Sequence, residues 1–295
     1  MVNLMETPQA LLLDATCKLV ELHDDPKWAA QLPTRCPPVL WFGNATSAKP
    51  KVLTLGANPS REEFLSDSSA RAIEKVRQSG DQSLLSYLEP PNHRFRVLFR
   101  SETLADILNS EKLQGQILTS YNAYFTRNPY KTWFGHNRDN SYKVEGFLRG
   151  FGASYYECSA VPQQAIHIDL FPFATLDDFV RIKEMAHAAF FADGWAQRLV
   201  GGLVEFLSPT VLILFGRTNC KHFGLYVDRS VSSNPWHSFS AGKYFVGRSK
   251  RFDVPVVGLS TNLGNPRGFD ALGLRAYGER LRQVVDNSVA RSVQP

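Results

Sequence analysis

The chain has 295 residues, of which 43% are hydrophobic and 21% are charged. This composition excludes an intrinsically disordered protein, and the length is sufficient for a single large domain with a substantial core. The net charge of +5 is a modest excess that favours a polyanionic partner without requiring one.

The amino terminus carries acidic residues within its apolar stretch and has no basic leader, and no later run approaches the ~20 apolar residues that span a bilayer. We therefore expect no signal peptide, no membrane partner and a cytoplasmic location. Cys17, Cys36, Cys158 and Cys220 are widely spaced, which predicts no disulfide framework, no metal and no cofactor. An iron–sulfur cluster held by these four cysteines is the alternative.

The first predicted element is an amphipathic helix over residues 8–24, which Pro26 closes. Residues 61–145 form a less regular region, predicted as an insertion of helices and loops. Within it, segment 128–142 is rich in aromatic, amide and cationic side chains without a clear period. We expect this segment to be a functional loop.

Short apolar runs of buried-strand type occur four times and alternate with longer helical patterns. The runs cover residues 51–56, 165–173, 210–216 and 254–260, and the helical patterns cover 176–192, 194–207 and 270–286. This alternation predicts an α/β fold, specifically a three-layer αβα sandwich around a central, mostly parallel four-stranded sheet. We expect residues 1–295 to form one such domain.

In sheets of this kind, ligands bind beyond the carboxyl ends of the strands. The first run leads into Gly56-Ala57-Asn58-Pro59-Ser60, the second contains His167 and Asp169, and the last opens into the loop 260–268. These three segments are therefore predicted to contain the functional residues. Taken alone, an Asn-Pro pair of this kind is more often a turn that ends a strand.

These motifs resemble, in order and spacing over roughly residues 38–285, those of the uracil-DNA glycosylase superfamily, particularly its mismatch-specific and single-strand-selective branches. The resemblance implies that 56–60 is the water-activating motif, 165–171 the base-recognition strand and 260–268 the loop that enters DNA. It also implies a monomeric, monofunctional enzyme whose partner is DNA, with no obligate protein partner. Such an enzyme flips a pyrimidine out of DNA and hydrolyses its N-glycosidic bond to leave an abasic site.

The chain departs from this family pattern at two positions. The usual His-Pro-Ser start of the last motif is absent, and Asp169 stands where an asparagine that reads uracil is expected. An ionised carboxylate only accepts hydrogen bonds, and the exocyclic amine of cytosine is a donor, so Asp169 points to a cytosine-type base. Modified cytosines of phage DNA are then conceivable substrates, which leaves base-excision repair and antiphage defence as alternative roles.

The predicted catalytic residues are Asn58, Asp169 and His167. The amide oxygen of Asn58 can orient a water, whereas a protonated Asp169 could instead donate to the departing base. His167 lies two residues before Asp169 and could pair with it, although a structural His–Asp pair is the simpler interpretation. Base contacts are predicted for Gly56, Ala57, Pro59, Ser60 and Asn262, with Phe134 or Trp133 as the stacking ring ahead of Tyr130 and Phe125.

The last loop is predicted to contact DNA, with Leu263 as a wedge and Arg267 on a phosphate. The other predicted DNA-binding residues are Ser260, Thr261, Gly264, Asn265, Lys243 and Arg248, with Lys250 and Arg251 beside them. A strand-to-helix turn and a solvated charge run are the alternative interpretations of these residues.

Two other functions remain open. One is a catalytically inactive DNA-binding module of the same fold. The other is a small-molecule α/β hydrolase, which the lack of a Gly-x-Ser-x-Gly motif disfavours because only Gly258-Leu259-Ser260 approaches it.

Overall fold

The computed structural model describes residues 7–292 except 158–159, 232 and 241. The chain separates into two compact units, each assembled from three segments. The first unit comprises Met1–Phe42, Ala57–Asn128 and Phe171–Phe206, and the second comprises Gly43–Gly56, Pro129–Leu170 and Leu207–Pro295. Both units use chain from early and late in the sequence. A single domain over residues 1–295 therefore stays a prediction.

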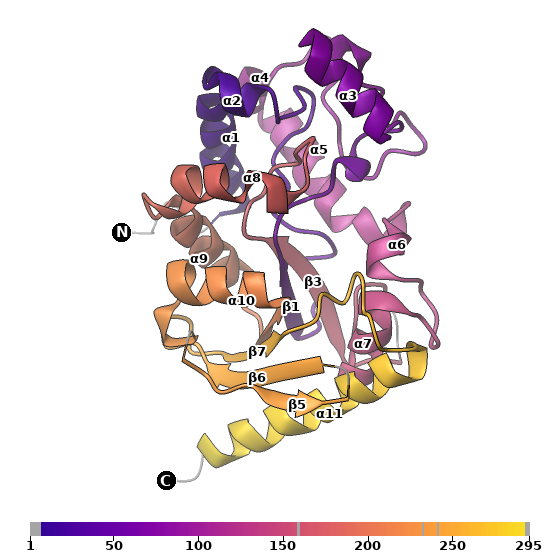
Figure 1. The fold of residues 1–295 in the computed structure, drawn as a ribbon, viewed down its shortest axis with the longest axis vertical. Coiled ribbons are helices and arrows are strands. Elements are labelled where there is room, and N and C mark those ends of the chain that lie inside the picture. Colours follow the sequence, from indigo (N-terminus) through magenta and orange to yellow (C-terminus); the bar gives the residue numbers. More distant parts are fainter. Residues whose placement is uncertain (1–6, 158–159, 232, 241, 293–295) are drawn as a thin grey trace. The chain divides into compact units, whose positions relative to one another are not determined.

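The second unit contains a seven-stranded, mostly parallel sheet in the order β2-β3-β1-β4-β7-β6-β5 (Figure 1). In chain order the strands are β1 (Lys51–Gly56), β2 (Ala153–Ser154), β3 (Gln163–Asp169), β4 (Val211–Phe215), β5 (His237–Phe239), β6 (Gly242–Arg248) and β7 (Pro255–Leu259). The pairs from β2 to β7 in this order are parallel, whereas β6 runs antiparallel to both β7 and β5.

The four predicted apolar runs form β3, β1, β4 and β7, which are neighbours in the middle of the sheet. Their strands are buried on both faces, which is why each run lacks an alternating polar pattern. The predicted number of strands, four, was nevertheless too low. β2 has only two residues, and β5 and β6 mix polar and apolar side chains at a partly exposed edge, so none of the three presents a continuous apolar run.

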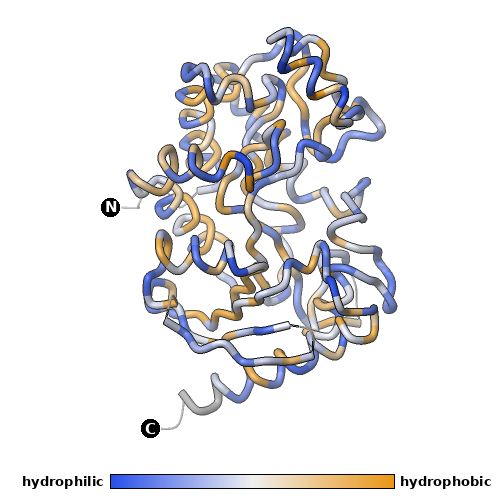
Figure 2. Tube along the Cα trace, in the orientation of Figure 1, coloured by the Kyte–Doolittle hydropathy of each residue, from blue (hydrophilic) through white to orange (hydrophobic). Residues whose placement is uncertain are grey.

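Four α-helices lie among the described residues of the second unit: α6 (Lys131–Phe134), α7 (Lys143–Phe151), α10 (Arg217–His222) and α11 (Ala271–Ser292). A π-helical turn (Phe223–Val227) and a 3-10 turn (Arg229–Val231) follow α10. The predicted loop 128–142 therefore contains one short helix, α6. Along α11 hydrophilic and hydrophobic residues alternate (Figure 2), and Leu274, Tyr277 and Leu281 are buried. α11 packs closely on α7 because Gly278 lacks a side chain, and a Cβ there would lie 2.0 Å from the carbonyl oxygen of Phe147.

The first unit is helical among its described residues. Its helices are α1 (Pro8–Asp24), α2 (Pro26–Ala29), α3 (Ala70–Ser79), α4 (Leu104–Asn109), α5 (Glu111–Asn122), α8 (Phe179–Ala186) and all but the last residue of α9 (Trp195–Leu207). Thr7 caps α1 by accepting a hydrogen bond from Ala10, and Pro8 occupies its first turn, so the sequence specifies where this helix begins. No described helix combines the length and apolarity that crossing a membrane requires.

Candidate active site

Four side-chain positions meet on one face of the sheet at the carboxyl ends of β1 and β3. The parallel register pairs Thr54 with His167 and Gly56 with Asp169. Because alternate residues of a strand point to the same face, the two pairs share that face. In the sheet, β3 and β2 lie on one side of β1, and β4 and β7, which come later in the chain, lie on its other side. The pairs therefore lie next to the switch point of the topology, where open α/β sheets bind ligands.

His167 and Asp169 form a buried pair, with 3.3 Å between His167 Nε2 and Asp169 Oδ1. Each residue is only 3% exposed. Both side chains lie directly over Gly56, where a Cβ would stand 2.4 Å from Asp169 Oδ1 and 2.8 Å from His167 Nε2. The backbone φ of Gly56 is not positive, so this glycine is required by the close approach of the pair rather than by a turn.

Aromatic rings surround the imidazole of His167. The ring centroids of Trp133, Phe134 and Phe215 lie 4.9, 5.4 and 6.4 Å from it, and Phe215 stacks within 14° of its plane. Phe134 is 2% exposed and packs edge-on against Tyr155, whereas Trp133 is half-buried. Of the two predicted stacking rings, Trp133 is therefore the one with surface available to a ligand.

The loop 260–268 contacts the same tryptophan. A Cβ on Gly264 would lie 2.0 Å from Trp133 Nε1, so the indole rests on the bare backbone of this loop. Asn262 Oδ1 accepts the Gly264 N–H at 3.0 Å, and Lys143 Nζ donates to the Gly264 carbonyl at 2.9 Å. The second unit thus brings together most of the predicted base-recognition strand, the predicted stacking ring and part of the predicted DNA loop.

Leu263, predicted to act as a wedge, is fully buried, so in this structure its side chain is not available to enter DNA. Its apolar side chain completes the core instead. The DNA-facing candidates that the structure leaves exposed are Lys243, Arg248, Asn262, Asn265, Arg267, Lys250 and Arg251. Arg248 is paired with Asp253 at 2.7 Å, and the Ser260 hydroxyl accepts the Lys243 N–H at 2.8 Å where β6 meets the end of β7. Thr261 is partly exposed.

Asn58 and its neighbours Ala57, Pro59 and Ser60 belong to the first unit. Asn58 Nδ2 donates to Thr175 Oγ1 at 3.1 Å and to the Pro59 and Phe173 carbonyls at 3.2 and 3.4 Å. Ser60 Oγ accepts the Glu62 N–H and begins a short turn. These bonds hold the amide of Asn58 by its nitrogen, and no donor among the described residues engages its oxygen. Asn58 Oδ1 is therefore oriented as an acceptor.

Sequence reasoning missed the residues behind His167. Thr54 Oγ1 lies 2.9 Å from His167 Nδ1 and 2.6 Å from the hydroxyl of Tyr155. Burial raises the pKa of the Tyr155 phenol well above its ordinary value, and the nearby charges of Glu145 and Asp169 raise it further, so the phenol keeps its proton. Neither Thr54 nor Tyr155 belongs to a motif. The register of β1 with β3 places Thr54 beside His167, and Tyr155 directly follows β2, which pairs with β3.

Glu145 positions the residues that lie behind His167. It is fully buried on α7 and accepts hydrogen bonds from Arg149 Nε, Ser154 Oγ and the Tyr155 N–H at 2.6, 2.6 and 3.1 Å. Burial raises the pKa of the carboxyl although Ser154 and Arg149 oppose the change. The carboxyl of Glu145 therefore links α7 to the segment that carries Tyr155.

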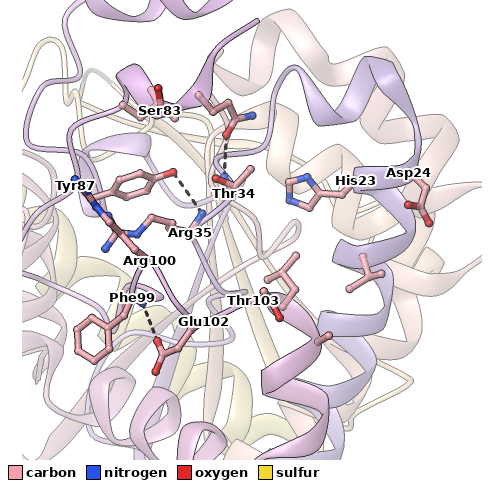
Figure 3. Close-up of a pocket in the computed structure, with 15 residues that line it drawn as sticks. His23, Asp24, Thr34, Arg35, Ser83, Tyr87, Phe99, Arg100, Glu102 and Thr103 are labelled. Carbon is pink, nitrogen blue, oxygen red and sulfur yellow. Dashed lines mark hydrogen bonds between the residues drawn. The ribbon is translucent and has the colours of Figure 1, made fainter.

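The first unit contains a separate cavity of about 790 Å³ that the sequence did not suggest (Figure 3). Its walls come from four distant segments: the end of α1, residues 34–35, residues 82–87 and residues 99–105. His23 lines one wall and Arg35 another. The Arg35 guanidinium lies over the ring of Tyr87 at 4.5 Å and pairs with Glu89 at 3.4 Å.

His23 is expected to make the stability of the protein depend on pH. Burial lowers the pKa of its imidazole below the ordinary value of 6.5, and the buried Nε2 has no hydrogen-bond partner among the described residues. Because the unfolded chain then binds more protons near and below pH 6.5, the free energy of unfolding should fall as pH drops through that value. Urea titrations at pH 7.5 and 5.5 should show a smaller decrease for His23→Gln than for the unsubstituted protein. The pKa of His93 is also lowered, so some decrease is expected in both proteins. An equal decrease in the two would contradict the assignment to His23.

The described residues contain no group of three or more His, Cys, Asp or Glu side chains placed to hold a metal ion. Cys17 is exposed, whereas Cys36 and Cys220 are buried as free thiols. Cys158, the fourth cysteine of the alternative iron–sulfur hypothesis, lies outside the described residues.

Three comparisons with known proteins bear on identity. No family model matches the chain, no curated protein matches it, and no solved structure matches it. The chemistry of the Asp169 site therefore carries the functional inference.

Proposed function

We propose that this chain is a DNA glycosylase of the uracil-DNA glycosylase type that everts a cytosine-type base and hydrolyses its N-glycosidic bond. The observation that carries the proposal is the Asp169 carboxylate, which lies buried at the carboxyl end of a central parallel strand. The three-layer αβα arrangement implied by the resemblance is part of the same proposal. DNA is the proposed partner, and base-excision repair and antiphage defence are the two roles consistent with it.

Asp169 has hydrogen-bonding capacity left for a substrate. Among the described residues its side chain makes one hydrogen bond, to His167, whereas a carboxylate offers about four acceptor positions. A base whose exocyclic amine donates can use the remaining positions. A base with an oxygen at that position would place a second acceptor opposite the Asp169 carboxylate. In a site with little access to water, this is unfavourable.

Trp133 is the proposed stacking ring. The half-buried indole sits between His167 and the backbone of Gly264, and flipped bases are commonly held against such a ring. Because Leu263 is buried, we assign the DNA contact of the last loop to the exposed Arg267 and Asn265, with Lys243 on the adjoining strand. Cationic side chains there would neutralise backbone phosphates.

The α/β hydrolase alternative is disfavoured by the environment of Ser260. Its hydroxyl accepts the Lys243 N–H, and no imidazole among the described residues bonds to it. A serine nucleophile needs an adjacent base to accept its proton. The inactive DNA-binding module remains the alternative that experiment has to separate from the enzyme.

Excision of a base is the direct test. The protein is incubated with single strands and duplexes that carry uracil, thymine mispairs, cytosine or modified cytosines, and abasic sites are then cleaved with alkali. We expect strand breaks at a cytosine-type base and a rate about 100-fold lower for Asn58→Ala, because that variant loses the group proposed to orient the water.

The matched control is Asn109→Ala, which removes an exposed amide from α4 and should leave the rate unchanged. DNA affinity measured by fluorescence anisotropy should be the same for all three proteins. Inertness on every base would overturn the proposal. Salt-sensitive binding without any abasic product would instead identify the inactive DNA-binding module.

A further inference from the structure

A row of hydrogen-bonding side chains runs through the second unit and ends at Asp169. From the interior outward it comprises the Tyr155 hydroxyl, Thr54 Oγ1, the His167 ring and Asp169 Oδ1. The successive distances are 2.6, 2.9 and 3.3 Å. Tyr155 is 1% exposed and Thr54 is fully buried, so bulk water does not intervene in the row.

The proton positions in this row follow from donor strength and distance. A phenol is a better donor than an aliphatic hydroxyl, and the buried Tyr155 keeps its proton, so Tyr155 donates to Thr54. Thr54 has one proton of its own, with His167 Nδ1 at 2.9 Å and the Ile166 carbonyl at 3.2 Å as the possible acceptors. The shorter contact favours Nδ1 as the acceptor of that proton, provided that the ring carries its own proton on Nε2.

In a neutral imidazole, the role of Nδ1 as donor or acceptor determines the role of Nε2. When Nδ1 accepts, a neutral ring carries its proton on Nε2, and Nε2–H donates to Asp169. Asp169 then receives its hydrogen bond as an ionised carboxylate. The opposite direction places the proton on Nδ1, leaves Nε2 as an acceptor, and requires Asp169 to be a protonated acid that donates.

We propose that Thr54 and Tyr155 are specificity-determining residues that act through the tautomer of His167, keeping Asp169 an acceptor for bases that carry an exocyclic amine. This inference rests on the proposed function for its consequence but not for the tautomer itself. Both residues lie behind His167 in the row, and the inference requires neither of them to contact the substrate. Both are positioning residues that select between the accepting and the donating form of Asp169.

The tautomer can be measured without any enzymatic assay. In protein labelled with ¹⁵N at its seven histidines, proton-detected spectra distinguish a ring protonated at Nε2 from one protonated at Nδ1. His167→Gln identifies the resonances of His167. We expect the Nε2–H form in the unsubstituted protein and in Thr54→Ser, which keeps the hydroxyl. An Nδ1–H form in the unsubstituted protein overturns the inference, even if no variant folds.

Thr54→Val is the informative variant because it preserves the shape of the side chain and removes the proton donated to Nδ1. It should shift His167 toward the Nδ1–H form or toward a mixture. Tyr155→Phe leaves the Thr54 hydroxyl in place and should produce a smaller change in the same direction. An unchanged His167 spectrum in folded Thr54→Val overturns the inference. If Thr54→Val does not fold, Tyr155→Phe decides in the same way.

Excision then tests the consequence for base choice. The ratio of the rate for an amine-bearing base to that for the corresponding oxo-bearing base should fall about tenfold in Thr54→Val and recover in Thr54→Ser. Asp169→Asn serves as the reference for a site that can donate. Equal ratios in Thr54→Val and Thr54→Ser contradict the specificity role. Inertness of the unsubstituted protein overturns the proposed function instead, and the spectra still decide the tautomer.

Discussion

Replacing Gly56 with alanine is expected to lower the excision rate by about 1,000-fold or more, because the added methyl group takes the space of the Asp169–His167 pair. A Cβ at this position would lie 2.4 Å from Asp169 Oδ1 and 2.8 Å from His167 Nε2, well inside van der Waals contact. Side-chain ends move more readily than backbone, so the pair should be displaced while the sheet remains intact. The free energy of unfolding should fall by only about 1–3 kcal/mol.

Gly115→Ala is the matched control for this prediction. Gly115 lies exposed within α5, and a Cβ there meets nothing within 4 Å, so alanine should stabilise the helix by up to ~1 kcal/mol and leave excision unchanged. Thermal unfolding followed by circular dichroism and the abasic-site assay report the two effects separately. Full excision activity in folded Gly56→Ala would show that the Asp169–His167 pair does not need its present position.

Replacing Glu145 with alanine is expected to destabilise the protein by about 3–5 kcal/mol, because it leaves a buried guanidinium without its closest partner. Glu145 is fully buried, and the Arg149 side chain is only 5% exposed. The substitution also removes the acceptor of Ser154 Oγ and of the Tyr155 N–H. Asp139, whose carboxylate lies 3.4 Å from Arg149 Nη1, remains a partial substitute.

Glu279→Ala removes an ion pair of the same i,i+4 type from a solvated helix face. Arg275 and Glu279 are 3.4 Å apart on α11, and both side chains are about half exposed, so this variant should lose no more than ~0.5 kcal/mol. Chemical denaturation at pH 7 measures both variants. Similar losses of unfolding free energy in the two variants would mean that burial does not strengthen the contribution of the Glu145–Arg149 pair.

The central strands and the position of the acidic residue could be predicted from sequence because their information is local. A fully buried strand must be apolar along its whole length, so the runs that became β1, β3, β4 and β7 stand out in composition alone. Asp169 is an acidic residue inside the apolar run 165–173, which made it a candidate functional residue without any knowledge of its neighbours, and the structure ends β3 at this residue. The edge strands β5 and β6 have no comparable feature, since one of their faces meets solvent.

The sequence by itself determined an α/β chain with parallel central strands and polar residues at their carboxyl ends, because local periodicity and strand-end chemistry do not depend on distant partners. The tertiary structure alone decided the register that aligns Thr54 with His167 and Gly56 with Asp169 across more than a hundred residues of chain. It also decided that Leu263 is buried and that Trp133 rests on Gly264. Apolar strands and rings are chemically interchangeable as packing partners, so only the packed core selects which of them meet.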